Sequence, residues 1–386
     1  MKPLPPRIFL KFFRWYCHPR LADYIEGDLI EVYRRRLTKM SKYKADLRFF
    51  IDVLLLFRPG IIRPRQPHYN PSGMYRNYLK VTLRVFNREK LYSLINVSGL
   101  ALGFTCCLFI YLFITDELSY DRFHADNDRI YRVAAAYMRQ GVWEPYASNA
   151  WRTSEHLKND YTEIEQMVRI MGDYDMFEYG GKRVDERRIA WVDENFFAVF
   201  NFPLVQGNPS EALKGPNKTV ISETTAARYF GTENPIGKVF KVQDGAFEVV
   251  VTGVMKDMPP NSHFHFDFIL SNATLKGNVS DNLFTNVGWD SQIIYVKLVP
   301  GADAKKMEAS FPSFVDRNLE FFKSTNFKMF MQPLTSIHLQ SNLGLEFEPN
   351  GSMFRVYTFS VIAIFILVIA CVNYMNLTTA RSLRRA

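Results

Sequence analysis

The sequence predicts a membrane protein in which two transmembrane α-helices flank an α+β domain, with a small α-helical domain at the N-terminus. Two segments of 25 residues each, 91–115 and 356–380, contain no charged residue. A helix needs about 20 apolar residues to cross the hydrocarbon core of a bilayer, so each segment is long enough. The residues between them, 116–355, have the mixed polar and apolar composition of a globular domain.

The charge distribution predicts the orientation of the chain in the membrane. Residues 1–90 have a net charge of +13, residues 116–355 a net charge of −7, and the tail 381–386 a net charge of +3. Positively charged flanks of a span remain in the cytoplasm. We therefore expect both termini to be cytoplasmic and the large domain to lie outside the inner membrane. The basic pI then reflects topology and does not indicate nucleic-acid binding.

The cysteines and the N-terminus agree with this arrangement. Cys106, Cys107 and Cys371 lie inside the spans and Cys17 lies near the N-terminus, so the exported domain contains no cysteine. That domain must be stabilised by its core alone. No apolar run follows the Pro-rich residues 1–6, so we expect the first span to act as the insertion signal.

The first 58 residues are predicted to form a cytoplasmic helical domain. Apolar residues recur at helical spacing over 19–37, and a second helix is expected over 44–57. The second helix is too short and too interrupted by Asp52 to be a third span. Residues 59–73 contain four prolines and are predicted to be a linker.

Residues 74–90 are predicted to form a basic amphipathic helix next to the first span. Arg76, Lys80, Arg84 and Arg88 recur every four residues and form a stripe along one side. Such a stripe is typical of a helix that binds the surface of an anionic membrane. The alternative is a solvated helix face that only stops translocation.

The first span contains a pair of glycines, Gly99 and Gly103, at a spacing that lets another helix approach closely. The same spacing also occurs by chance in spans, so a packing face is one of two interpretations. Neither span contains Asp, Glu, Lys, Arg or His. The spans therefore contain no candidate for a proton relay.

The domain over 116–355 is expected to mix short strands and helices. Asp193 is a candidate cap for a helix over 194–200, and Ser222 is a candidate cap for a helix ending at Phe230. Asp244 and Gly245 predict a hairpin turn. The expected strands cover 219–221, 238–242, 247–255, 264–270 and 293–299.

We find no motif that predicts catalysis, a cofactor or a metal. The segment 231–239 has the wrong spacing for a phosphate-binding loop, and Val239 stands where a metal-binding hydroxyl is needed. His263, His265 and Asp267 alternate with phenylalanines and could share one face of a strand. Three such side chains could bind a metal, but the pattern equally describes an ordinary half-buried strand.

Several segments resemble ABC-transporter permeases of the FtsX/MacB type. The matching segments follow in order from residue 74 to residue 386: NYLKVTLRVFNREKLYSLINVSGLALG, DELSYDRFHADNDRIYRV, VDENFFAVFNFPLVQGNP, VISETTAARYFGTENPIGK, VTGVMKDMPPNSHFHFDF, QPLTSIHLQS and CVNYMNLTTARSLRRA. The segment RWYCHPRLADYIEGDLIEVYRRR resembles a helical prefix domain found before some of these permeases. The resemblance implies that residues 116–355 are a MacB-like periplasmic core domain.

The resemblance also implies a function. These permeases dimerise in the inner membrane and pair with a cytoplasmic ATPase, which hydrolyses the ATP, so the chain itself is expected not to be an enzyme. Arg381, Arg384 and Arg385 are then expected to face the ATPase. The family continues into a coupling helix and two further spans, so this chain corresponds to the N-terminal half of a four-span permease or to a two-span form.

The resemblance leaves other aspects of function open. A periplasmic adaptor or an outer-membrane partner is compatible with it, and so are macrolides, peptides, lipoproteins or purely mechanical work as the task. The alternative function is a two-span membrane sensor or an anchored periplasmic binding protein.

Overall fold

The computed structural model describes residues 4–62, 71–88, 90–275, 292–319 and 322–383. The chain divides into two compact units, Met1–Ser93 and Leu94–Ala386. Two helices in the described residues are long and apolar enough to cross a membrane, Ser93–Glu117 and Met353–Met375. They flank a domain of mixed strands and helices, which confirms the predicted fold class.

The first unit contains four described helices, three of which pack around a small core of their own. Its helices are α1 (Arg7–Tyr16), α2 (Pro19–Leu37), α3 (Lys42–Leu55) and α4 (Pro71–Arg88). Phe13, Tyr33 and Phe49 are almost fully buried where α1, α2 and α3 meet. The prediction of α2 is confirmed, and α3 begins and ends two residues earlier than expected. Helix α1 was not predicted, although Arg7, Lys11 and Arg14 recur at helical spacing and form one polar side of it.

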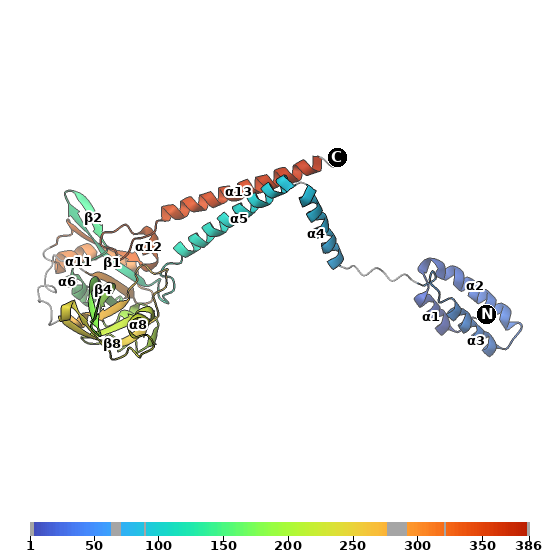
Figure 1. The fold of residues 1–386 in the computed structure, drawn as a ribbon, viewed down its shortest axis with the longest axis horizontal. Helices are drawn as coiled ribbons and strands as arrows, with labels where there is room; N and C mark the ends of the chain where they lie inside the picture. Colours follow the sequence, from blue (N-terminus) through green and yellow to red (C-terminus); the bar gives the residue numbers. More distant parts are fainter. Residues whose placement is uncertain (1–3, 63–70, 89, 276–291, 320–321, 384–386) are drawn as a thin grey trace. The chain divides into compact units, whose positions relative to one another are not determined.

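The two spans belong to long helices that run side by side (Figure 1). These are α5 (Lys90–Glu117) and α13 (Met353–Leu383). The rings of Phe113 and Phe359 meet edge to face with centroids 5.2 Å apart. Further along, the Cys107 thiol donates a hydrogen bond to the Ala363 carbonyl over 3.6 Å. Residue numbers rise along one helix as they fall along the other, so the pair is antiparallel.

The domain between the spans is built on one mixed sheet. The described residues form eleven strands, with the order β11-β1-β10-β3-β4-β9-β6-β8-β5, while β2 pairs with β1, and β7 with β3 and β8. The β4–β9 and β6–β8 pairs are parallel and the others are antiparallel. The strands are β1 (Ile130–Arg139), β2 (Val142–Tyr146), β3 (Ile164–Tyr179), β4 (Lys182–Val192), β5 (Leu204–Gln206), β6 (Lys218–Ser222), β7 (Val239–Val242), β8 (Phe247–Met255), β9 (Phe268–Ser271), β10 (Ile293–Leu298) and β11 (Phe327–Pro333).

Short helices connect and cover these strands. They are α6 (Trp151–Asp160), α7 (Phe196–Val199), α8 (Glu223–Phe230), α10 (Ala304–Ala309), α11 (Phe311–Asn318) and α12 (Ile337–Gln340), with the 3-10 turns η1 (Gln243–Gly245), η2 (Asn272–Thr274) and η3 (Leu334–Ser336). Helices α10 and α11 bury Met307, Phe311 and Phe314 in a cluster with residues of β1, β10 and β11.

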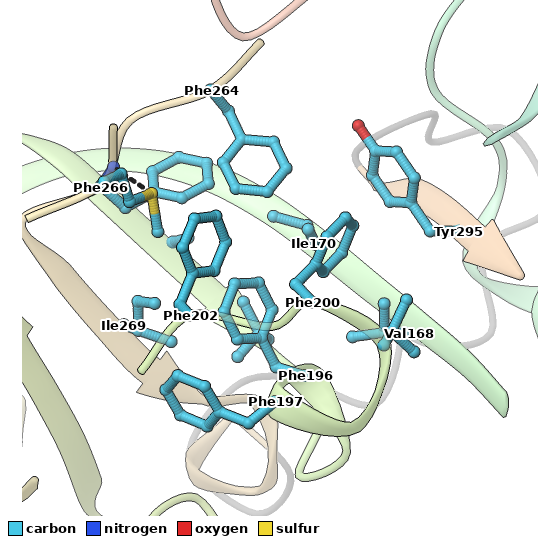
Figure 2. Close-up of a cluster of buried hydrophobic side chains, with 14 of the residues drawn as sticks. Val168, Ile170, Phe196, Phe197, Phe200, Phe202, Phe264, Phe266, Ile269 and Tyr295 are labelled. Atoms are coloured by element: carbon cyan, nitrogen blue, oxygen red, sulfur yellow. Dashed lines mark hydrogen bonds between the residues drawn. The ribbon is translucent and has the colours of Figure 1, made fainter. Parts of the chain in front are cut away.

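Phenylalanines dominate the centre of this domain (Figure 2). Phe196, Phe200 and Phe264 are fully buried beside Tyr295 of β10. The Phe200 ring meets the rings of Phe264 and Tyr295 edge to face, with 5.2 Å between the centroids in each pair. Burying one such side chain stabilises a fold by about 1.5–3 kcal/mol. The cysteine-free domain therefore has the large apolar core that the sequence required.

Most local predictions in the domain are confirmed. Ser222 caps α8, and its hydroxyl accepts a hydrogen bond from the Thr225 amide. Strands β7 and β8 form the predicted hairpin, in which Asp244 and Gly245 both have positive φ angles. The prediction that Asp193 caps a helix is wrong. The helix begins at Phe196 after Asn195, without a capping side chain.

The expected strand over 264–270 is only partly correct, because β9 begins at Phe268. The backbone before it belongs to an irregular loop in which Phe264 and Phe266 still reach the core.

Candidate functional site: where the spans enter the domain

The four basic residues of the predicted stripe all lie exposed on α4. A step of four residues turns an α-helix by about 40° beyond a full turn. Arg76, Lys80, Arg84 and Arg88 therefore occupy an arc of about 120° on one side of the helix. This placement is compatible with both interpretations of the stripe, membrane binding and solvation.

Gly99 and Gly103 lie on the side of α5 that faces α13. A Cβ atom on Gly103 would lie 3.6 Å from both Ala370 and Ile366, and one on Gly99 would lie 3.8 Å from the Asn373 amide. A groove of about 590 Å³ follows this contact between the two helices. A Cβ atom would thus fit at both positions in ordinary contact, whereas a longer side chain would meet α13.

The predicted ATPase-facing residues lie at the end of the chain. Arg384 and Arg385 are outside the described residues. The backbone of Arg381 continues α13, and its side chain is not described.

A group of side chains that was not predicted joins the two spans to the domain. Glu117 is the last residue of α5, and its Oε2 atom lies 3.0 Å from Nε2 of His338 on α12. The ring of Tyr120 stacks on the His338 ring at 3.4 Å with an interplanar angle of 5°. Gly351 lies two residues before α13, and a Cβ atom there would lie 2.6 Å from Glu117 Oε2 and from His338 Nε2. We call Glu117, Tyr120, His338 and Gly351 the junction cluster.

The junction cluster is shielded from water. Only 15% of the Glu117 side chain and 9% of the His338 side chain are exposed. Burial is also the first cause of a raised pKa at Tyr120, reinforced by the nearby carboxylates of Asp116 and Glu117. A buried polar pair of this kind holds its partners in one arrangement, because separating them would leave unpaired polar groups.

The first residues after α5 are fixed to a loop far along the chain. The Asn261 side-chain amide donates hydrogen bonds to the Ser119 carbonyl and hydroxyl over 3.2 and 3.0 Å. The Asp121 amide donates to the Asn261 carbonyl over 2.9 Å. The end of the first span is therefore held to the body of the domain through both the side chain and the backbone of Asn261.

Asp121 continues into a buried chain of polar groups. Its Oδ1 atom lies 2.8 Å from Nδ1 of His263, whose Nε2 atom lies 2.7 Å from the Tyr295 hydroxyl. Burial raises the pKa of Tyr295. All three side chains are buried, so a substrate has no access to them, and we assign them a structural role.

The residues that lead into α13 are held by two further ion pairs. Arg132 of β1 is fully buried and binds Glu346 in a bidentate manner, with Nη2 to Oε1 at 2.8 Å. His265 Nδ1 lies 3.0 Å from Glu348 Oε2. The hydrogen bond to Glu348 raises the pKa of His265 against the effect of burial. The approach to the second span is thus fastened to the same domain as the end of the first span.

The three residues considered for a metal do not converge. His265 pairs with Glu348, His263 with Asp121, and the Asp267 carboxylate accepts a hydrogen bond from Ser222. Among the described residues, no group of three His, Cys, Asp or Glu side chains could hold a metal ion.

Asp193, the wrongly predicted cap, instead binds Arg169. Two hydrogen bonds of 2.8 Å join the Asp193 carboxylate to the Arg169 guanidinium, which lies 4.2 Å above the Trp151 ring. These side chains line a polar hollow of about 450 Å³ beside α6. Arg169 and Asp193 neutralise each other in this hollow, and we assign their pair a structural role.

Comparison with known proteins identifies the domain. The family model of the MacB-like periplasmic core domain matches residues 93–313, more than half of the chain. The chain belongs to the MacB-like permease family. The match begins in the first span and includes Glu117 and Tyr120, whereas His338 and Gly351 lie beyond its end. No protein of curated function matches the chain in sequence.

Solved structures with partial similarity come from several permeases. A domain assigned to a permease of Porphyromonas gingivalis is 20% identical, with a TM-score of 0.48, and the match covers 55% of this chain and 92% of that one. The periplasmic region of MacB from Actinobacillus actinomycetemcomitans is 15% identical (TM-score 0.39; 55% and 91% covered). The extracellular domain of the noncanonic ABC-type transporter YknZ from Gram-positive bacteria is 16% identical (TM-score 0.36; 52% and 99% covered).

Family membership establishes the general class of the protein. It is a membrane protein and a permease component of the ABC type, a generally non-catalytic kind of subunit. The sequence-based recognition of an FtsX/MacB-type permease is confirmed. The junction cluster could not be recognised in the same way, because no spacing rule connects Glu117 to a histidine 221 residues later.

Proposed function

We propose that this permease couples a partner ATPase to motion of its periplasmic domain in an export or mechanotransmission complex. In this proposal two copies of the chain, as full subunits or as N-terminal halves of longer ones, form a dimer in the inner membrane. Both termini face the cytoplasm, where a separate ATPase subunit hydrolyses ATP, and Arg381, Arg384 and Arg385 approach that subunit. The α4 stripe binds anionic lipid of the inner leaflet.

The observation that carries the proposal is the junction cluster. Glu117 at the end of α5 contacts His338 of the domain, and Gly351 before α13 packs against both. A displacement of either span would therefore act directly on the same buried contact. Because packed polar contacts resist gradual deformation, motion of the spans is passed to the domain as a whole.

The partner can be tested by purification. A tagged full-length chain, extracted gently from the membranes in which it is naturally expressed, is expected to retain an ATPase subunit with a phosphate-binding loop. If no ATPase is retained under any mild extraction condition, the coupling proposal is wrong.

The coupling itself can be tested at the junction cluster. We expect His338→Gln to abolish the nucleotide-dependent movement of a probe attached at Asp244, an exposed residue of the β7–β8 hairpin, while ATPase binding is retained. Glu211→Gln is a matched control, since the Glu211 side chain pairs with Lys214 at 3.4 Å on the surface. Movement that persists unchanged in the His338 variant would show that force reaches the domain elsewhere.

A further inference from the structure

The N-terminal helical domain exposes large apolar side chains on α1. Ile8, Phe12 and Trp15 follow at steps of four and three residues and therefore lie on one side of the helix. The exposed fractions of Ile8 and Trp15 are 73% and 70%. The rings of Phe12 and Trp15 stack with centroids 6.1 Å apart. These residues are not needed for the core, which α1 reaches through Phe13 and Tyr16.

Helix α3 extends this apolar surface. Leu47, Ile51 and Leu54 have the same spacing and are each more than two-fifths exposed. The two helices touch through Phe9 and Phe50, whose ring centroids are 4.8 Å apart.

Phe12, Leu47 and Leu54 border the contact between the two helices, and Ile8, Trp15 and Ile51 continue their rows at helical spacing. Phe12 lies three residues after Phe9, and Leu47 and Leu54 lie three before and four after Phe50. Neighbours at such spacings share a helix side, so the apolar residues of both helices flank one contact. We call Ile8, Phe12, Trp15, Leu47, Ile51 and Leu54 the outer apolar face.

Cations border the outer apolar face on both helices. Lys11 lies between Ile8 and Trp15 at helical spacing, while Lys44 precedes Leu47 by three residues and Arg48 precedes Ile51 by three. All three cations are exposed. Over residues 1–58 the sequence has 13 Lys and Arg against 6 Asp and Glu, a net charge of +7.

We propose that the outer apolar face binds the surface of a bilayer that contains anionic lipid. Tryptophan, phenylalanine and leucine beside lysine and arginine are the composition of helices that lie in the membrane interface. Each cation near an anionic surface contributes to the attraction. A protein partner would bury apolar residues too, but the exposed cations that border the face on both helices favour an anionic lipid surface as the occupant.

The length of the chain keeps this face close to a membrane. Residues 63–70 separate Ile62 from the start of α4, and α4 is followed almost directly by the first span. A segment of this length reaches about 30 Å at most when extended, and the 18 residues of α4 add about 27 Å before the first span. The face therefore meets the bilayer at a high effective concentration, so that even weak binding is sufficient.

The test uses the full chain in lipid nanodiscs, with its four cysteines replaced by alanine. The environment-sensitive fluorophore NBD is attached at Ile8→Cys. The matched control is Tyr24→Cys on α2, which is 84% exposed and lies outside the outer apolar face. With phosphatidylglycerol in the nanodisc, we expect a blue-shifted, several-fold brighter signal at position 8 that lipid-attached quenchers reduce, and no change at position 24. Phosphatidylcholine alone should give a much smaller effect.

Charge reversal provides a second measurement. Lys11→Glu combined with Lys44→Glu is expected to reduce the signal at position 8 to its value in phosphatidylcholine, although both substitutions are on the surface and leave the core intact. A water-like signal at position 8 in both lipids would overturn the proposal, as would equal signals in both. A shift that appears only after addition of the purified ATPase subunit would instead identify a protein interface.

Discussion

At the scale of single residues, the buried guanidinium of Arg132 depends on one carboxylate for its charge balance. Glu346 binds it in a bidentate manner, and Gln332 and Ser341 accept further hydrogen bonds from it at 2.6 and 2.9 Å. Burial is the largest single effect on Glu346 and opposes its ionised form. The hydrogen bond and charge of Arg132, together with the hydrogen bond from Ser341, outweigh it, so the pKa of Glu346 is lowered. The pair therefore stabilises the domain fully when the pH is above the ordinary pKa of a glutamate. This stabilisation is lost as the pH falls through the lowered pKa of Glu346.

Removal of that charge gives a measurable loss of stability. Glu346→Gln leaves Arg132 buried without a counter-charge, and we expect it to lower the free energy of unfolding by about 3 kcal/mol. Glu211→Gln is the control, since the Glu211–Lys214 pair is exposed and such pairs contribute less than about 1 kcal/mol. Thermal unfolding of both variants in detergent gives the comparison. Equal losses would mean that Gln332 and Ser341 are sufficient partners for Arg132.

His124 is a second residue with a defined effect on stability. Burial lowers its pKa from 6.5 to about 4, and its Nδ1 atom accepts a hydrogen bond from the Asn201 amide over 3.1 Å. Between pH 6.5 and 4 the unfolded chain binds a proton that the folded chain excludes. The contribution of neutral His124 to the free energy of unfolding is therefore fully present above pH 6.5 and is lost as the pH falls toward 4.

We expect His124→Gln to make stability less sensitive to acid in that window. Glutamine retains an acceptor for the backbone amide of Asn201 but does not titrate. The part of the free energy of unfolding that depends on the protonation of His124, on the order of 3 kcal/mol, should therefore disappear. The measurement is the melting temperature of variant and parent across this pH range. His265, whose pKa is raised, has the opposite pH dependence and is common to both proteins, so it cancels in the comparison. Parallel curves would contradict the assignment to His124.

At the scale of elements, local signals explain which parts were predictable. Helix α2 and the two spans have long, regular patterns, and α8 has its cap in the adjacent residue Ser222. Strand β3 was missed because it has polar residues on both faces and is placed by its pairing with β4 and β10. The junction cluster was missed for the same reason, since its members meet only after the domain has folded.

The contact between α5 and α13 supplies a prediction for Gly103. A methyl group there would meet Ala370 and Ile366 at an ordinary contact distance of 3.6 Å, so Gly103→Ala should be tolerated. Gly103→Leu adds three further carbons against α13, and we expect it to separate the helices. The readout is disulfide formation between Phe113→Cys and Phe359→Cys, placed where the two rings meet, in a chain without native cysteines. An undiminished cross-link in the leucine variant would show that the glycine is not required for packing.

At the scale of the whole molecule, the proposed function depends on the unequal distribution of charge between residues 1–90 and the domain over 116–355. The coupling proposal requires that the domain and the two termini lie on opposite sides of the membrane. Family membership and the two apolar helices establish a membrane protein, while the excess of Lys and Arg in residues 1–90 predicts its orientation.

The orientation can be measured with reporters at the β7–β8 hairpin. Gly245 has open space around it and a positive φ in an exposed turn, so an insertion there should leave the sheet intact. We expect alkaline phosphatase fused after Gly245 to be active, because it folds only outside the cytoplasm, and a green fluorescent protein at the same place to remain dark. The same reporters fused at the N-terminus should give the reverse result. A fluorescent reporter that is active at Gly245 would place the domain in the cytoplasm. The domain would then lie on the same side of the membrane as the ATPase, and coupling through the spans would be excluded.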